Sequence, residues 1–130
     1  MIIALACTAV LAALVFGLGA NVTRLRAATA TRGGNQQPTD PADPLLKAIR
    51  AHGNATEYIP TLIVLFLLVA VRAPAWTLAF AVGATAARLV HAWGILAAQS
   101  LAGPTKLRVA GASGTYLFGL ALTVTMLATL

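Results

Sequence analysis

Four long stretches of the chain are almost free of charged residues. They cover about residues 1–22, 48–71, 74–98 and 107–130, and together they contain most of the sequence. A transmembrane helix needs about 20 mostly apolar residues, because it rises about 1.5 Å per residue through a hydrocarbon core about 30 Å thick. The pattern therefore predicts an all-α integral membrane protein: one domain, residues 1–130, built as a bundle of four transmembrane helices. The small residues 111–114 are predicted to allow close helix packing.

The first stretch is interpreted as a retained transmembrane helix rather than a cleaved signal peptide. A signal peptide has a basic region ahead of its apolar part, whereas this chain begins Met-Ile-Ile-Ala and its basic residues follow, starting at Arg24. The next link, about residues 24–47, is the only long polar stretch and is rich in glycine and proline, which predicts a loop. At its end, Asp43 is a suitable N-cap and Pro44 a suitable first residue for a second helix.

Composition supports the same class and excludes others. The chain is 59% hydrophobic and only 9% charged, whereas roughly a quarter of the residues of a soluble domain are charged. Its net charge of +6 does not indicate a disordered or nucleic-acid-binding protein, because such basic proteins are poor in Leu, Ile and Val. Cys7 is the only cysteine, so no internal disulfide can form, and no metal-ligand spacing is present. No metal site is predicted.

Basic residues are concentrated around the links that follow the first and third apolar stretches. These two links and their flanks hold Arg24, Arg26, Arg32, Lys47, Arg50, Lys106 and Arg108, whereas the link after the second stretch holds only Arg72. The positive-inside rule therefore places loops one and three in the cytoplasm and both chain termini outside. The expected location is the inner or plasma membrane of a bacterium.

A few polar residues lie within the second apolar stretch or close to its start. Arg50, Asn54 and Glu57 are spaced i, i+4 and i+7, which puts them within about 60° of one another on one helical face. His52 falls on a different face. An ionisable group inside a membrane is costly unless it faces water, a partner or the bundle interior, so Glu57 indicates a functional site. The alternative is purely structural: Arg50 contacts Glu57, through Asn54, and the contact holds helices together.

Polar groups from all four predicted helices lie in the same half of the membrane. Arg24 ends the first helix on the cytoplasmic side, Arg108 starts the fourth there, and Arg88 and His91 lie past the middle of the third. Such a cluster, rich in guanidinium groups, suits an anionic or zwitterionic ligand, because arginine binds carboxylates through two parallel hydrogen bonds. His91 taken alone is more typical of a packing residue.

The run RAHGNATEYIP, residues 50–60, resembles the second-helix signature of the MAPEG family, the membrane-associated proteins in eicosanoid and glutathione metabolism. That family includes microsomal glutathione transferases, microsomal prostaglandin E synthase and the non-catalytic five-lipoxygenase activating protein. Four spans, the chain length and the long first loop also agree with the family. The resemblance therefore covers the whole chain.

The resemblance implies a homotrimer with glutathione bound in a cytoplasm-facing cleft between neighbouring subunits. His52 and Arg24 match positions that the family contributes from the adjacent subunit. The run RLVH, residues 88–91, matches the third helix of the family. The implied glutathione-binding residues are Arg24, Arg50, His52, Asn54, Glu57, Tyr58 and His91.

The fourth helix supplies the implied catalytic residue. Arg108 occupies the place of an arginine proposed to stabilise the glutathione thiolate in the family. Two positions depart from the family pattern: Ile95 stands where several enzymes have an aromatic hydroxyl, and Val109 where prostaglandin E synthase has a serine. Prostaglandin isomerisation is therefore not expected.

The leading hypothesis is a glutathione-dependent transferase or peroxidase that detoxifies lipophilic electrophiles dissolved in the bilayer. A free thiol has a pKa of about 8.5 and cationic neighbours lower it, so Arg108 would raise the fraction of reactive thiolate. A rival hypothesis is a non-catalytic lipid-binding or scaffold protein in which the polar cluster only holds the trimer together. A third is a small transporter or proton relay built on Glu57 and His91.

Overall fold

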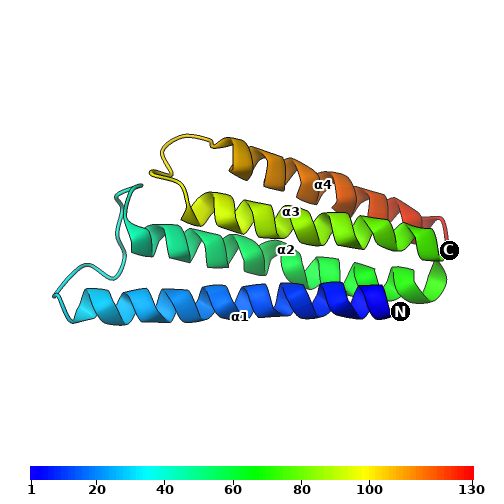
Figure 1. The fold of residues 1–130 in the computed structure, drawn as a ribbon, viewed down its shortest axis with the longest axis horizontal. Coiled ribbons are helices and arrows are strands. Elements are labelled where there is room, and N and C mark those ends of the chain that lie inside the picture. Colours follow the sequence, from blue (N-terminus) through cyan, green and yellow to red (C-terminus); the bar gives the residue numbers. More distant parts are fainter.

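The computed structural model describes all of residues 1–130 and contains four long α-helices and no strands. The helices are α1 (Ile2–Ala30), α2 (Pro44–Arg72), α3 (Leu78–Leu96) and α4 (Lys106–Leu127), and one short 3-10 helix, η1 (Ala75–Thr77), precedes α3. They lie side by side as an elongated bundle in which the chain reverses direction at each connection (Figure 1). All four are long and apolar enough to cross a membrane, α3 together with η1. The predicted all-α class is confirmed.

The two ends of the bundle differ in what they carry. Both termini and the short α2–α3 connection lie at one end, and the longer connections, residues 31–43 and 97–105, lie at the other, which we call the loop end (Figure 1). The two loops are joined by a hydrogen bond of 2.8 Å from the backbone nitrogen of Leu101 to the carbonyl oxygen of Pro41. Lys47 Nζ donates to the carbonyl oxygen of Ala98 at 3.0 Å and so ties the start of α2 to the end of α3.

The helices extend beyond the predicted spans at the loop end. α1 continues to Ala30 and α2 begins at Pro44, so the connecting loop is residues 31–43 rather than the predicted 24–47. Apolar patterning reports where the hydrocarbon ends, and a helix continues past that point because its backbone hydrogen bonds are internal. The predicted cap of α2 is confirmed, since Asp43 Oδ1 accepts from the backbone nitrogens of Leu45 and Leu46 at 2.7 and 3.2 Å.

The outer surface of the bundle is strongly apolar. Phe16 is 79% exposed, and Leu117 and Leu120 are 66% and 65% exposed. Such surface is unfavourable in water but matches lipid hydrocarbon. Trp76 and Trp93 are also exposed, near the two ends of the third span, where tryptophan side chains favour the membrane–water interface. The buried core lies between the helices and includes Leu11, Ile59, Leu62, Phe66 and Leu122.

α3 and α4 pack against each other more extensively than any other pair of helices. A Cβ atom at Gly111 of α4 would lie 2.5 Å from the backbone nitrogen of His91, and one at Gly94 of α3 would lie 2.8 Å from that of Arg108. Only glycine fits at these two positions without displacing the opposite helix. The prediction of close packing at Gly111 is confirmed, and this contact sets His91 and Arg108 side by side.

Candidate functional site

A polar cavity of about 290 Å³ lies near the loop end among α2, α3 and α4. Every polar residue that lines it is one of the predicted site residues. The lining consists of Arg50, Asn54, His91, Ile95, Leu101 and Arg108. Residues up to 58 positions apart in the sequence therefore meet at one site within a single chain, although their role in binding stays a prediction.

Arg50 and Asn54 also border a second, smaller hollow. This hollow has a volume of about 150 Å³, and Glu57 lines it together with Ile49, Arg50, Gly53 and Asn54. The carboxylate of Glu57 is on an exposed residue rather than in the polar cavity. Of the three residues predicted to share a face of α2, Arg50 and Asn54 therefore line the polar cavity, whereas Glu57 lies next to it.

Asn54 is held in place by a buried arginine. Arg88 is 1% exposed, and its Nη2 donates to Asn54 Oδ1 at 2.7 Å and to the backbone oxygen of Asn54 at 3.2 Å. The guanidinium carbon also lies 5.2 Å from the ring centroid of Tyr58, a cation–π distance. Arg88 Nε has no hydrogen-bond partner. The side chain of Asn54 hydrogen-bonds to Arg88 and makes no hydrogen bond to Arg50 or Glu57.

Arg88 is a site residue that the sequence reasoning left without a role. Its position three residues before His91 puts both residues on one side of α3. That spacing was the available signal. Its partner, Asn54, is 34 residues away in the sequence, so the contact itself depends on how α2 and α3 pack.

His91 connects α3 to the first turn of α4. Its Nδ1 lies 2.9 Å from the carbonyl oxygen of Arg108. A carbonyl oxygen can only accept, so the Nδ1 of His91 carries the hydrogen. The contact joins the imidazole to the backbone of the residue predicted to be catalytic.

Arg108 is fixed at the amino-terminal end of α4. Its backbone nitrogen donates to the N-cap hydroxyl of Thr105 at 3.4 Å, and its Nη1 donates to the carbonyl oxygen of Gly103 at 2.7 Å. The side chain is partly buried and lines the polar cavity. The guanidinium charge and the positive end of the helix dipole therefore act in the same place, and both favour an anion.

Arg24 and His52 do not reach the polar cavity of their own chain. Arg24 is exposed and its Nη2 donates to Asn21 Oδ1 at 2.9 Å. His52 lines a separate hollow of about 450 Å³ on the α1–α2 side of the bundle, with Gly19 and Arg26 among its neighbours. Their expected contribution to the site of an adjacent subunit stays a prediction.

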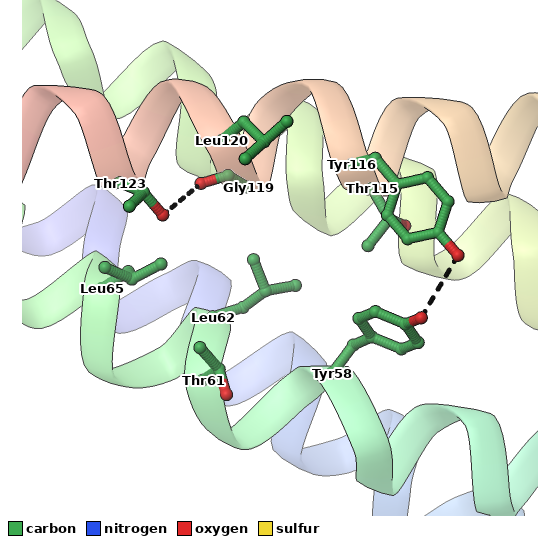
Figure 2. Close-up of a pocket in the computed structure, with 9 residues that line it drawn as sticks. All are labelled: Tyr58, Thr61, Leu62, Leu65, Thr115, Tyr116, Gly119, Leu120 and Thr123. Atoms are coloured by element: carbon green, nitrogen blue, oxygen red, sulfur yellow. Dashed lines mark hydrogen bonds between the residues drawn. The ribbon is translucent and has the colours of Figure 1, made fainter.

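Tyr58 lines an apolar groove beside the polar cavity. Figure 2 shows the Tyr58 side chain of α2 pointing toward Tyr116 of α4, with the two hydroxyl oxygens 3.2 Å apart. The groove has a volume of about 280 Å³ and continues along Leu62, Leu65 and Leu120 (Figure 2). Sequence reasoning missed Tyr116, because nothing local to α4 marks it as the partner of a tyrosine on α2.

Comparison with models of known protein families identifies the family of the chain. The model of the MAPEG family matches residues 4–128. The chain belongs to the MAPEG family. It is therefore an integral membrane protein of a family that acts in glutathione and eicosanoid metabolism, as the run at residues 50–60 indicated. No curated protein and no solved structure matches it.

The polar cavity of this MAPEG protein is suited to an anion rather than a metal ion. Two arginines, one amide and one imidazole line it, and no group of three His, Cys, Asp or Glu that could hold a metal ion occurs in the structure. Guanidinium groups bind carboxylates and stabilise negative charge. The arrangement can hold an acidic small molecule and stabilise an anion next to Arg108.

Proposed function

We propose that this MAPEG protein is a glutathione-dependent transferase or peroxidase that acts on lipophilic electrophiles in the membrane. The observation that supports it most is the convergence of Arg50, Asn54, His91 and Arg108 on one cavity. Glutathione is a tripeptide with two carboxylates, an ammonium group and a thiol. The cavity and the adjoining hollow offer a partner for each of these groups.

Arg50 binds a carboxylate of glutathione through paired hydrogen bonds. The contact of its Oδ1 with Arg88 orients the amide of Asn54, and Nδ2, which makes no hydrogen bond within the chain, donates to the peptide. Glu57 lines the adjoining hollow and accepts from the ammonium group. In a homotrimer, Arg24 and His52 complete the site from a neighbouring subunit.

Arg108 stabilises the thiolate form of glutathione. Nearby positive charge lowers the pKa of a thiol from about 8.5, so more of the nucleophile is present at neutral pH. The thiolate attacks the electrophile, and holding both reactants in place removes much of the entropic cost of their encounter. The electrophile reaches the site from the bilayer, through the apolar surface of the bundle.

The loop end of the bundle faces the cytoplasm in this proposal, and both termini face outside. Basic residues gather in and beside the two loops, at Arg24, Arg26, Arg32, Lys47, Lys106 and Arg108. The cavity then opens on the side of a bacterial inner membrane where glutathione is made.

Calorimetric titration of the detergent-solubilised protein with glutathione tests this proposal. We expect binding at millimolar glutathione or below, and loss of most of that binding in Arg50→Ala. Arg72→Ala is the matched control, because Arg72 is the last residue of the same helix at the opposite end of the bundle. Absence of binding at millimolar glutathione would contradict the enzyme proposal and favour a non-catalytic lipid-binding or scaffold role.

A further inference from the structure

His91 presents an unprotonated nitrogen to the polar cavity. Its Nδ1 donates to the carbonyl oxygen of Arg108, so in the neutral ring Nε2 is an acceptor without a hydrogen. Nε2 makes no hydrogen bond within the chain, and it is not buried. Because His91 lines the cavity, its Nε2 is open to a bound ligand.

No other group in the cavity can accept a proton. Arg50 and Arg108 are permanently protonated cations, and an amide such as Asn54 is not basic. Ile95 and Leu101 complete the lining and are apolar. The carboxylate nearest in sequence, Glu57, lines the adjoining hollow instead. His91 is therefore the only base in the lining of this cavity.

We propose that Nε2 of His91 takes the proton from the bound thiol, an inference that rests on the thiol-dependent function proposed above. The S–H bond breaks, its electron pair stays on sulfur, and the proton moves to Nε2. The imidazolium keeps its Nδ1 hydrogen bond to the carbonyl oxygen of Arg108, which stabilises the added charge. The sulfur anion lies against the guanidinium group of Arg108.

The proton then returns as the reaction is completed. In an addition, the C–S bond forms and the imidazolium gives its proton to the substrate atom that receives the displaced electron pair. In a substitution, the C–S bond forms and the leaving group departs with the bond electrons and takes the proton. Either step restores neutral His91, so no oxidant or reductant is needed.

The positive charges around His91 make the imidazolium unfavourable unless the negative charge on sulfur forms at the same time. Arg50 of α2 and Arg108 of α4 line the same cavity as His91, and Arg88 lies one turn earlier on α3. Removal from water and the charges of Arg88 and Arg108 disfavour an imidazolium alone, and Glu57 lines the adjoining hollow instead. Transfer from thiol to imidazole leaves the total charge of the cavity unchanged, which matters where water screening is weak.

His91→Asn separates proton transfer from positioning. The Nδ2 of asparagine replaces the Nδ1–H donor to the Arg108 carbonyl, but an amide cannot take a proton. Thiolate formation is followed by its ultraviolet absorbance on addition of glutathione. Proton release is measured by calorimetry in two buffers that differ in ionisation enthalpy.

We expect the wild-type protein to form thiolate while releasing almost no proton to the buffer. His91→Asn should still bind glutathione, with a dissociation constant up to about tenfold higher than that of the wild type, because the contact of Nε2 with the thiol is lost. It should form at least about tenfold less thiolate at neutral pH, and release one proton for each thiolate that does form. His91→Phe loses the donor as well, so it should show the same thiolate defect together with a lower unfolding temperature.

Equal thiolate formation and equal proton release in the wild type and His91→Asn would overturn this inference alone. Release of a full proton by the wild type would do the same, since the proton would then leave the cavity. If the wild type binds no glutathione, the proposed function fails and the role of His91 fails with it.

Discussion

The polar cavity and the apolar groove have nearly the same volume, about 290 and 280 Å³, but opposite chemistry. Both use the same stripe of α2, on which Arg50, Asn54, Tyr58 and Leu62 follow one another at intervals of four residues. Each interval advances about 6 Å along the helix. The side chains on the stripe change from guanidinium to amide, phenol and alkyl with increasing distance from the loop end.

Arg88 contacts residues of both the polar cavity and the apolar groove. It donates to Asn54, which lines the polar cavity, and its guanidinium group lies over the ring of Tyr58, which lines the groove. A buried cation needs polar partners because removal from water is costly, and here one side chain from each hollow supplies them. One face of α2 therefore lines both a polar cavity and an apolar groove, and a single buried arginine contacts a side chain from each.

Gly111→Ala should reduce stability and ligand binding more than the other substitutions, because α4 carries residues of both the polar cavity and the apolar groove. The added methyl group would lie 2.5 Å from the backbone nitrogen of His91, and overpacking of this kind costs up to about 3 kcal/mol. We expect a clearly lower unfolding temperature in detergent, measured by circular dichroism, and loss of glutathione binding. Gly17→Ala is the control, since nothing lies within 4 Å of the added atom. Equal stability of the two variants would contradict the close α3–α4 contact.

Arg108→Ala should damage the polar cavity and spare the groove. Loss of one group that stabilises a developing anion lowers turnover by about 100-fold or more. We expect turnover with a model electrophile to fall by that factor, while the dissociation constant for glutathione rises by less than about tenfold. Arg108→Lys should retain part of the activity because it keeps the charge. Full activity in Arg108→Ala would show that another group stabilises the thiolate.

Asn54→Ala should weaken the link between the hollows. Arg88 Nη2 would keep only the backbone acceptor of residue 54, and loss of a hydrogen bond to a buried charge costs about 2 kcal/mol. A thermal unfolding series should show this loss together with weaker glutathione binding. Thr56→Ala is the control on the same helix, because that exposed hydroxyl bonds only to the carbonyl oxygen of Gly53. A destabilisation no greater than that of Thr56→Ala would mean that the Arg88 contact contributes little.

Tyr116→Phe should have the smallest effect and should act on the groove alone. It removes one hydroxyl from the pair with Tyr58, a change worth about 1 kcal/mol. We expect a slight fall in the unfolding temperature and no change in glutathione affinity, measured by calorimetry. A marked loss of glutathione affinity would show that the two hollows act as one site.

Local signals were enough to predict much of this protein. Apolar runs predicted the four helices, Asp43 and Pro44 predicted the start of α2, and the small residues near Gly111 predicted a close helix contact. These signals depend on residues next to one another in the chain or one helical turn apart. The spacing of Arg50 and Asn54 predicted a shared face in the same way, and the polar cavity lies on that face.

Contacts between helices could not be predicted in the same way. The pairing of Arg88 with Asn54 and of Tyr116 with Tyr58 joins residues 34 and 58 positions apart. The spacing of His52 predicted a separate helical face, and the resemblance assigned Arg24 and His52 to the site of an adjacent subunit; both lie away from the polar cavity of their own chain. The depth of a residue follows from its place along one helix, whereas the residues that it faces depend on how two helices pack together.

The amino-acid sequence by itself therefore determined the membrane class, the four helices and the position of each polar residue along its helix, because hydrophobic transfer acts on each segment separately. The MAPEG signature at residues 50–60 could also be read from the sequence, because its residues are contiguous in the chain. Only the tertiary structure decided which polar side chains meet. The rotation of each helix about its axis is set by packing, as at Gly111 and Gly94, and that rotation brings His91 to Arg108 and Arg88 to Asn54.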